Sequence, residues 1–132
     1  HAFHQIECHA SRMRWRTQGR VTVPMVLRCP YGGGVRALEH HSESREAFWA
    51  HIPGLKMVIP SSPRKARALL VSAIRDPDPV IFYEPKALYR AFREEVPEAE
   101  ERMSWQMPHL LHCKIIRRVL LAAMECLLQA RV

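Results

Sequence analysis

Two short motifs in the first half of the chain could carry chemistry. Three glycines, Gly32–Gly34, follow an apolar segment and free the backbone for positive φ angles and for close approach to a ligand. His40 and His41 follow shortly after, and an imidazole can exchange a proton near neutral pH. The glycine run is neither a P-loop nor a dinucleotide-binding fingerprint. We expect either a ligand loop beside an acid–base histidine or, more simply, a histidine in a polar surface turn.

The remaining cysteines, histidines and carboxylates form no recognised metal motif. No two of the four cysteines have the C-x-x-C spacing, and we expect reduced thiols, although an even count would also allow disulfides. His109 and His112 could share a helix face but lack the acidic partner of an H-E-x-x-H site. Asp76 and Asp78, in an Asp-Pro-Asp-Pro run, could cap a helix end and form a turn.

Three apolar segments predict the buried strands that would position these motifs. They span residues 21–27, 55–59 and 80–83. Pro24 cannot donate to a strand ladder, so the first strand should begin at Met25 or lie at a sheet edge.

Helices are predicted before and between the strands. Apolar residues recur every three or four positions over 3–18, and Gly19 should end that helix. Ser44 should cap a short helix over 45–51, and Ser62 should cap a longer one that ends before the Asp-Pro-Asp-Pro run.

The alternation of strands and helices predicts an α/β fold. Nearly all-apolar strands separated by helices are typical of a parallel sheet with helices on both faces. Ligands in such folds bind beyond the carboxyl ends of the strands. Because the glycine run and His41 both follow the first strand, we expect any chemistry at this edge of the sheet.

Length and charge narrow the functional classes. The chain has 132 residues, a length that allows one domain at most. Its formal charge is +7. No apolar run approaches the roughly 18 residues of a membrane span. The basic residues are scattered, are interrupted by an acidic stretch over 94–101, and do not interleave with aromatics, so we expect no nucleic-acid partner. The alternative, a basic nucleic-acid binder, would be retained on DNA in a salt-sensitive way.

Several longer motifs carry a family resemblance. They run in order from about residue 2 to about residue 97 and include Ala2-Phe3, Arg28, Pro30–Gly33, His41–Ser42, His51–Pro60, Ser72–Asp76, Pro79–Lys86 and Leu88–Arg90. This part of the chain resembles the beta subunit of thiamine-diphosphate-dependent 2-oxo acid dehydrogenases. It is most similar to the bacterial pyruvate, branched-chain 2-oxo acid or acetoin enzymes, and residues 82–86 and 94–97 lean toward the branched-chain type.

The resemblance implies a fold, a reaction and partners. The fold is the pyrimidine-binding domain of the transketolase-like superfamily, here incomplete and spanning residues 1–97. The reaction is oxidative decarboxylation of a 2-oxo acid on thiamine diphosphate, with acyl transfer to a lipoyl arm of the acyltransferase core. The family's alpha subunit holds the diphosphate and its magnesium, in a heterotetramer of two alpha and two beta subunits. The expected location is the bacterial cytoplasm or the mitochondrial matrix.

The resemblance also implies roles for particular residues. His41 matches the histidine beside the reacting centre, whereas His40 is given no role. A potassium ion orders the loop beside the site in this family, and its matching positions here are Val23, Met25, Val26, Ala73, Ile74, Asp76 and Asp78. The glutamate that activates the cofactor and the aromatic residue that stacks on it lie upstream of Ala2, so we expect no cofactor-binding residue in this chain.

Residues 98–132 match nothing in the family and are expected to form an atypical tail. Residues 115–132 could form one apolar helix, and a frameshifted or truncated reading frame would explain this segment. Because the activating glutamate is missing, the isolated chain is expected to be inactive, and the parent enzyme to act only with an alpha subunit. The alternatives are an acetoin-cleaving or other transketolase-like enzyme, and a non-catalytic truncated product.

Overall fold

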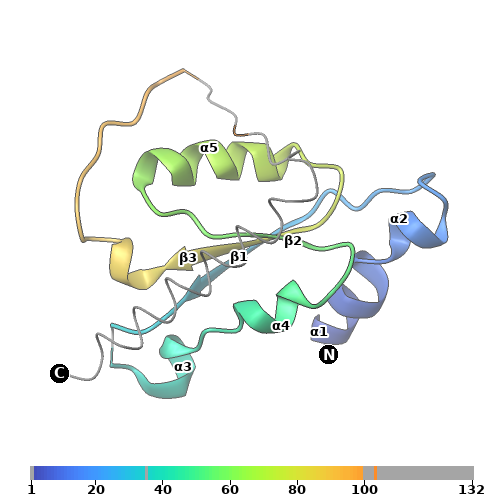
Figure 1. Ribbon diagram of the computed structural model, residues 1–132, viewed down its shortest axis with the longest axis horizontal. Coiled ribbons are helices and arrows are strands. Elements are labelled where there is room, and N and C mark those ends of the chain that lie inside the picture. The colour runs from blue at the N-terminus through green and yellow to red at the C-terminus, as the bar shows by residue number, and fades with distance from the viewer. Residues whose placement is uncertain (1, 35, 100–102, 104–132) are drawn as a thin grey trace.

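A three-stranded parallel sheet forms the centre of the molecule (Figure 1). The computed structural model describes residues 2–34, 36–99 and 103. The strands are β1 (Val26–Tyr31), β2 (Lys56–Val58) and β3 (Val80–Pro85), in the order β1-β3-β2. Both β1 and β2 pair with β3 in parallel, which confirms the predicted sheet.

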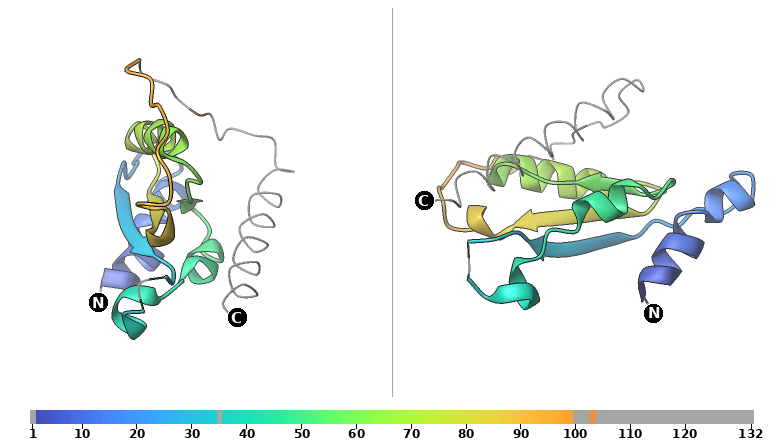
Figure 2. Two further views of the ribbon diagram at one scale, coloured as in Figure 1. Left: turned by 90° about the vertical axis from the view of Figure 1, so that its left-hand side faces the viewer. Right: turned by 60° about the horizontal axis from the view of Figure 1, so that its bottom comes forward.

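Helices cover both faces of this sheet, as the sequence predicted. They are α1 (Ala2–Gln5), the π-helix η1 (Ile6–Ala10), α2 (Met13–Arg16), α3 (Leu38–Ser42), α4 (Glu46–Ala50), α5 (Pro63–Ile74) and the 3-10 helix η2 (Lys86–Leu88). Helix α5 lies on one face, and α1 and α4 lie on the other (Figures 1 and 2). Two apolar clusters fill the interfaces: Ala73, Val80 and Phe82 on the α5 side, and Trp49, Ile52, Leu55, Ile81 and Tyr83 on the other.

The first strand lies further along the chain than predicted. It begins one residue after Met25 and continues through Pro30 to Tyr31, beyond the expected end at Leu27. Among the described strands β1 pairs only with β3, so a proline without an N–H is tolerated on its open side. Pro24 stays outside the strand, as predicted.

The N-terminal helix is interrupted rather than continuous over 3–18. A π-type turn separates α1 from α2, and the Ser11 N–H donates to the Ile6 carbonyl at 3.0 Å. The predicted end is confirmed, because Gly19 has a φ of 81° and its N–H donates to the Arg14 carbonyl at 2.8 Å.

The remaining helix starts were predicted with mixed success. The Ser62 hydroxyl caps α5 and accepts from the Lys65 N–H at 3.4 Å, as expected. The prediction that Ser44 caps the next helix was wrong: Arg45 precedes α4, and its side chain makes no capping hydrogen bond. The segment that carries His41 forms the short helix α3.

No helix in the described ranges is long and apolar enough to cross a membrane. Cys8 and Cys29 are free thiols. The predicted helix over 115–132, the pair His109 and His112, and the other two cysteines lie outside the described residues.

A close backbone contact at Gly54 holds the N-terminal helical segment against the entry to β2. Gly54 has a φ of +89°, and a Cβ atom there would lie 1.9 Å from the Ser11 carbonyl oxygen and 2.9 Å from the Ser11 carbonyl carbon. Only glycine adopts this backbone without strain and leaves room for the carbonyl.

We expect Gly54→Ala in the full chain to lower the free energy of unfolding by about 2–4 kcal/mol, because strain and a backbone clash add. Urea denaturation measures this loss. Gly33→Ala is the matched control, since no atom lies within 4 Å of a Cβ there and its φ is not positive. Equal losses in the two variants would contradict the close-contact interpretation.

Candidate functional site

The carboxyl edge of the sheet brings three loop segments together. The register pairs Tyr31 of β1 with Pro85 of β3, so the chain leaves both strands at the same level. The Gly32 N–H donates to the Glu43 carbonyl at 3.1 Å, which ties the glycine loop to the link between α3 and α4. A Cβ at Gly34 would lie 3.8 Å from the Ala87 side chain of η2.

The structure places His41 at this edge, close to the glycine loop as predicted. Its side chain is exposed on α3. Its backbone carbonyl accepts a hydrogen bond from the Lys86 ammonium of η2, which anchors the short helix to the end of β3. An accessible imidazole on an anchored helix can hydrogen-bond a substrate carboxylate or move a proton.

Two buried oxygen atoms, one on α3 and one on α4, were missed by the sequence reasoning. The Ser42 hydroxyl oxygen and the Glu46 Oε2 atom are buried, and neither has a hydrogen-bond partner among the described residues. Glu46 is only 7% exposed, and a buried carboxylate is costly unless it is paired. A glutamate just before the aromatic pair Phe48 and Trp49 was the available signal. These atoms can accept from a ligand or from a further polypeptide segment.

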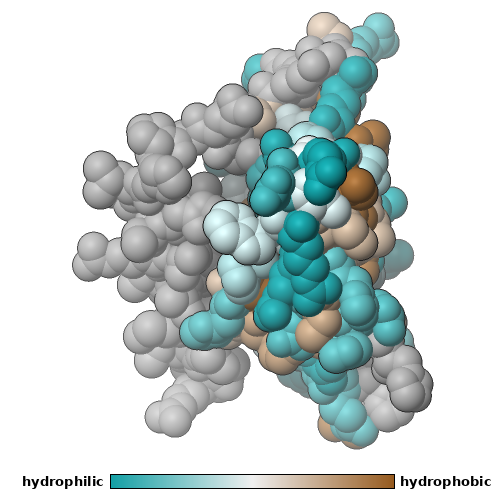
Figure 3. Space-filling view, turned by 90° about the vertical axis from the view of Figure 1, so that its right-hand side faces the viewer, coloured by the Kyte–Doolittle hydropathy of each residue, from teal (hydrophilic) through white to brown (hydrophobic). Residues whose placement is uncertain are grey.

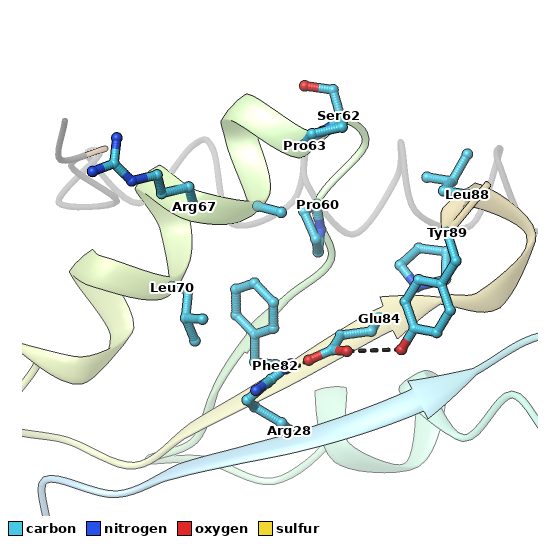
Figure 4. A pocket seen from close by; sticks show the side chains of 12 residues that line it. Arg28, Pro60, Ser62, Pro63, Arg67, Leu70, Phe82, Glu84, Leu88 and Tyr89 are labelled. Carbon is cyan, nitrogen blue, oxygen red and sulfur yellow. Dashed lines mark hydrogen bonds and ion pairs between the residues drawn. The ribbon is translucent and has the colours of Figure 1, made fainter. Parts of the chain in front are cut away.

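A hydrogen-bonded trio lies on the α5 side of the same edge (Figure 4). Arg28 Nε donates to one oxygen of Glu84 at 2.5 Å, and the Tyr89 hydroxyl donates to the other at 2.7 Å. The Arg28 hydrogen bond holds the pKa of Glu84 below its ordinary value. Burial, and then the bond to Glu84, raises the pKa of Tyr89 to about 12. The sequence signal was a pair of charges inside otherwise apolar strands.

This trio closes one end of a cavity of about 290 Å³ between α5 and β3 (Figure 4). Most of its lining is apolar: Pro60, Pro63, Ala66, Leu70, Phe82, Pro85 and Leu88. The carboxylate that faces the cavity is already paired with Arg28. The cavity therefore suits an apolar group rather than a cation or acid–base chemistry.

The predicted potassium ligands lie at the opposite, amino-terminal edge of the sheet, away from His41. Both carboxylate oxygens of Asp76 bind the Lys56 ammonium, at 2.6 and 2.7 Å. Asp78 pairs with Arg14 at 2.9 Å and with Lys56 at 3.3 Å. The potassium-binding loop was expected beside the reacting centre. The matching residues are instead separated from His41 by the length of β3.

The donor set fits a potassium ion only incompletely. Two of the matching carbonyl oxygens already accept backbone hydrogen bonds: Met25 from the Val80 N–H at 2.8 Å, and Ala73 from the Asp76 N–H at 3.2 Å. The Lys56 ammonium also supplies positive charge to the Asp76 carboxylate, and a second cation would have to share it. In the described part of the chain, no group of three or more histidines, cysteines or acidic residues could hold a metal.

The fold and this edge together define a class of protein. A parallel α/β domain that delivers a glycine loop and an exposed histidine to the carboxyl ends of its strands is built to bind a ligand there. The family model of the transketolase pyrimidine-binding domain matches residues 2–91. The chain therefore belongs to the transketolase pyrimidine-binding domain family.

Individual relatives agree with this assignment. The chain is 63% identical over 89 residues to a pyruvate dehydrogenase E1 component subunit beta of Acholeplasma laidlawii, covering 67% of this chain and 27% of that protein. It is 57% identical over 96 residues to the same subunit of Mycoplasma genitalium, covering 73% and 29%. It is 49% identical over 98 residues to the mitochondrial 2-oxoisovalerate dehydrogenase subunit beta 2 of Arabidopsis thaliana, covering 74% and 27%. The chain thus spans less than a third of the length of these relatives.

The lowered pKa of Glu84 predicts a pH dependence of stability. A carboxylate whose folded pKa lies below its ordinary value of 4.5 stabilises the fold above that value, and this stability is lost as the pH falls through the folded pKa. Glu84→Gln should therefore destabilise the chain at about pH 6, and its difference from the parent should shrink toward about pH 3. Urea midpoints across this range measure the effect. Glu95→Gln is the control, an exposed carboxylate expected to show no such trend.

Proposed function

We propose that this chain is part of the beta subunit of a thiamine-diphosphate-dependent 2-oxo acid dehydrogenase. The reaction is oxidative decarboxylation of pyruvate or a branched-chain 2-oxo acid, followed by acyl transfer to a lipoyl group. The observation that carries the proposal is 63% identity over 89 residues to a pyruvate dehydrogenase beta subunit. A branched-chain 2-oxo acid is included as a candidate substrate because a 2-oxoisovalerate dehydrogenase subunit is 49% identical to this chain over 98 residues.

His41 is the proposed catalytic residue. Thiamine diphosphate, when bound, would supply the electron sink that decarboxylation needs. The His41 ring nitrogens can then hydrogen-bond the substrate carboxylate or move a proton at the substrate oxygen. Lys86 positions the imidazole indirectly, because it holds the His41 carbonyl and therefore the turn of α3.

The proposed assembly requires other chains. An alpha subunit would hold the diphosphate and magnesium in a heterotetramer with two beta subunits, and a lipoyl acyltransferase core would accept the acyl group. The site of action would be the bacterial cytoplasm or the mitochondrial matrix. Within this chain, residues 1–97 would contribute the partial domain, and residues 98–132 would be a tail outside it.

A chimeric enzyme tests the catalytic role. Residues 2–97 replace the matching segment of the Mycoplasma genitalium subunit, which is 57% identical over 96 residues, and the product is assembled with that organism's alpha subunit. Pyruvate-dependent reduction of ferricyanide should be retained, and His41→Ala should lower kcat by about 100-fold or more. His9→Ala, which removes an exposed histidine of η1, should leave kcat unchanged.

An assembled but inactive chimera would contradict the proposed function. Full kcat in the His41→Ala variant would contradict only the role of His41. The full chain of 132 residues, mixed with the alpha subunit alone, is expected to show no activity.

The potassium site is a separate and weaker proposal, because Lys56 already pairs with Asp76. Bound potassium would raise the unfolding midpoint of the full chain in potassium chloride above that in choline chloride at equal ionic strength. Asp76→Asn should abolish the difference. Equal midpoints of the parent chain in the two salts would contradict a potassium site.

A further inference from the structure

An aromatic and basic surface on α2 has no role in the proposed function. Trp15 is 87% exposed, the highest value among the large apolar residues described. Arg12 and Arg16 are also exposed, and neither forms an ion pair with any residue that the structure describes. We call these three residues the α2 surface. Helix α2 lies on the side of the molecule turned to the viewer in Figure 3, and that side is largely hydrophilic.

Helical geometry places the three side chains next to one another. The Arg16 N–H donates to the Arg12 carbonyl at 2.9 Å, so the backbone completes one helical turn between them. Residues three and four apart are neighbours on a helix, which puts both Trp15 and Arg16 beside Arg12. The indole of Trp15 and the guanidinium group of Arg16 are therefore both placed near Arg12.

Two other cations near this surface are neutralised: Arg14 pairs with Asp78 at 2.9 Å, and Lys56 pairs with Asp76 at 2.6 Å. The Arg14 pair ties α2 to the segment before β3. Arg12 and Arg16 form no ion pair with a described residue, and Arg20 just beyond the helix donates only to the Thr17 carbonyl, so the local charge is positive. The α2 surface therefore favours a partner that brings carboxylates or other anions.

The size of the adjoining hollow indicates a polypeptide. A hollow of about 1490 Å³ lies between α2 and the turn at Pro53–Gly54. Small-molecule pockets are typically about 300–1,000 Å³, so this one is too wide to be filled by one small ligand.

We propose that the α2 surface docks an acidic polypeptide segment. An apolar side chain of the partner would pack on the Trp15 indole, and partner carboxylates would pair with the guanidinium groups of Arg12 and Arg16. Tryptophan and arginine are the residue types that carry most binding energy at protein interfaces. The planar guanidinium matches a carboxylate with two parallel hydrogen bonds. This proposal does not depend on the proposed function.

Fluorescence anisotropy with a labelled peptide tests the proposal on the full chain. The probe is an eight-residue peptide of glutamates around one leucine and one phenylalanine. The double variant Arg12→Glu/Arg16→Glu should weaken binding at least tenfold, and Trp15→Ala should weaken it about fivefold. Arg12→Lys/Arg16→Lys keeps the charge but loses the paired hydrogen bonds, so it should weaken binding by less than the charge-reversed double variant does.

Matched controls separate this surface from net charge and from general exposure. Arg90→Glu/Arg93→Glu makes the same change in net charge at exposed positions elsewhere, and Phe92→Ala removes another exposed aromatic side chain. Both should change the peptide affinity less than twofold. Circular dichroism monitors the fold of each variant.

Three results would overturn the proposal. The first is no binding of the peptide to the parent chain. The second is an equal loss of affinity in the two charge-reversed double variants, which would mean that net charge alone attracts the peptide. The third is tighter binding of a labelled single-stranded oligonucleotide that depends on Arg12 and Arg16, which would assign the α2 surface to nucleic acid instead.

Discussion

The burial of β3 between two parallel neighbours is the constraint on which the rest of the structure depends. Val80 and Ile81 are completely buried and Phe82 is 2% exposed. Alternate side chains enter the two apolar clusters, so each face of β3 needs its own covering helix. The backbone polar groups of β3 are satisfied only by strands on both sides. Burying apolar surface at about 25 cal/mol per Å² then favours a single arrangement of helices around the sheet.

The parallel direction of the strands gives the two edges of the sheet different roles. At the carboxyl edge, the glycine loop, α3 and η2 leave the sheet together and expose His41. At the amino edge, the Arg14–Asp78 ion pair fastens the N-terminal helical segment, and the Lys56–Asp76 pair joins β2 to the segment before β3. The first edge offers accessible polar groups and unpaired acceptors, as a binding site requires. The second has its charges largely satisfied internally, except on the α2 surface.

Family membership and the structure support the proposed function in different ways. The match to the transketolase pyrimidine-binding domain family over residues 2–91 agrees with the small parallel sheet and its covering helices. The proposal of 2-oxo acid chemistry comes from the identity with relatives, of which this chain spans less than a third. The buried oxygens of Ser42 on α3 and Glu46 on α4 have no partner among the described residues, which is consistent with a site that is completed by a ligand or another segment.

Local signals in the sequence determined the elements that depend on neighbours along the chain. The apolar runs predicted β2 and β3 in nearly correct positions, and Ser62 predicted the start of α5 because capping acts within one turn. The sequence also determined the α/β class and the edge at which His41 lies. Only the tertiary structure decided the extension of β1 through Pro30, which requires an open strand side, and the pairing of Arg28 with Glu84 across 56 positions. Such contacts depend on strand register, and no local pattern encodes register between segments that meet only after the sheet has formed.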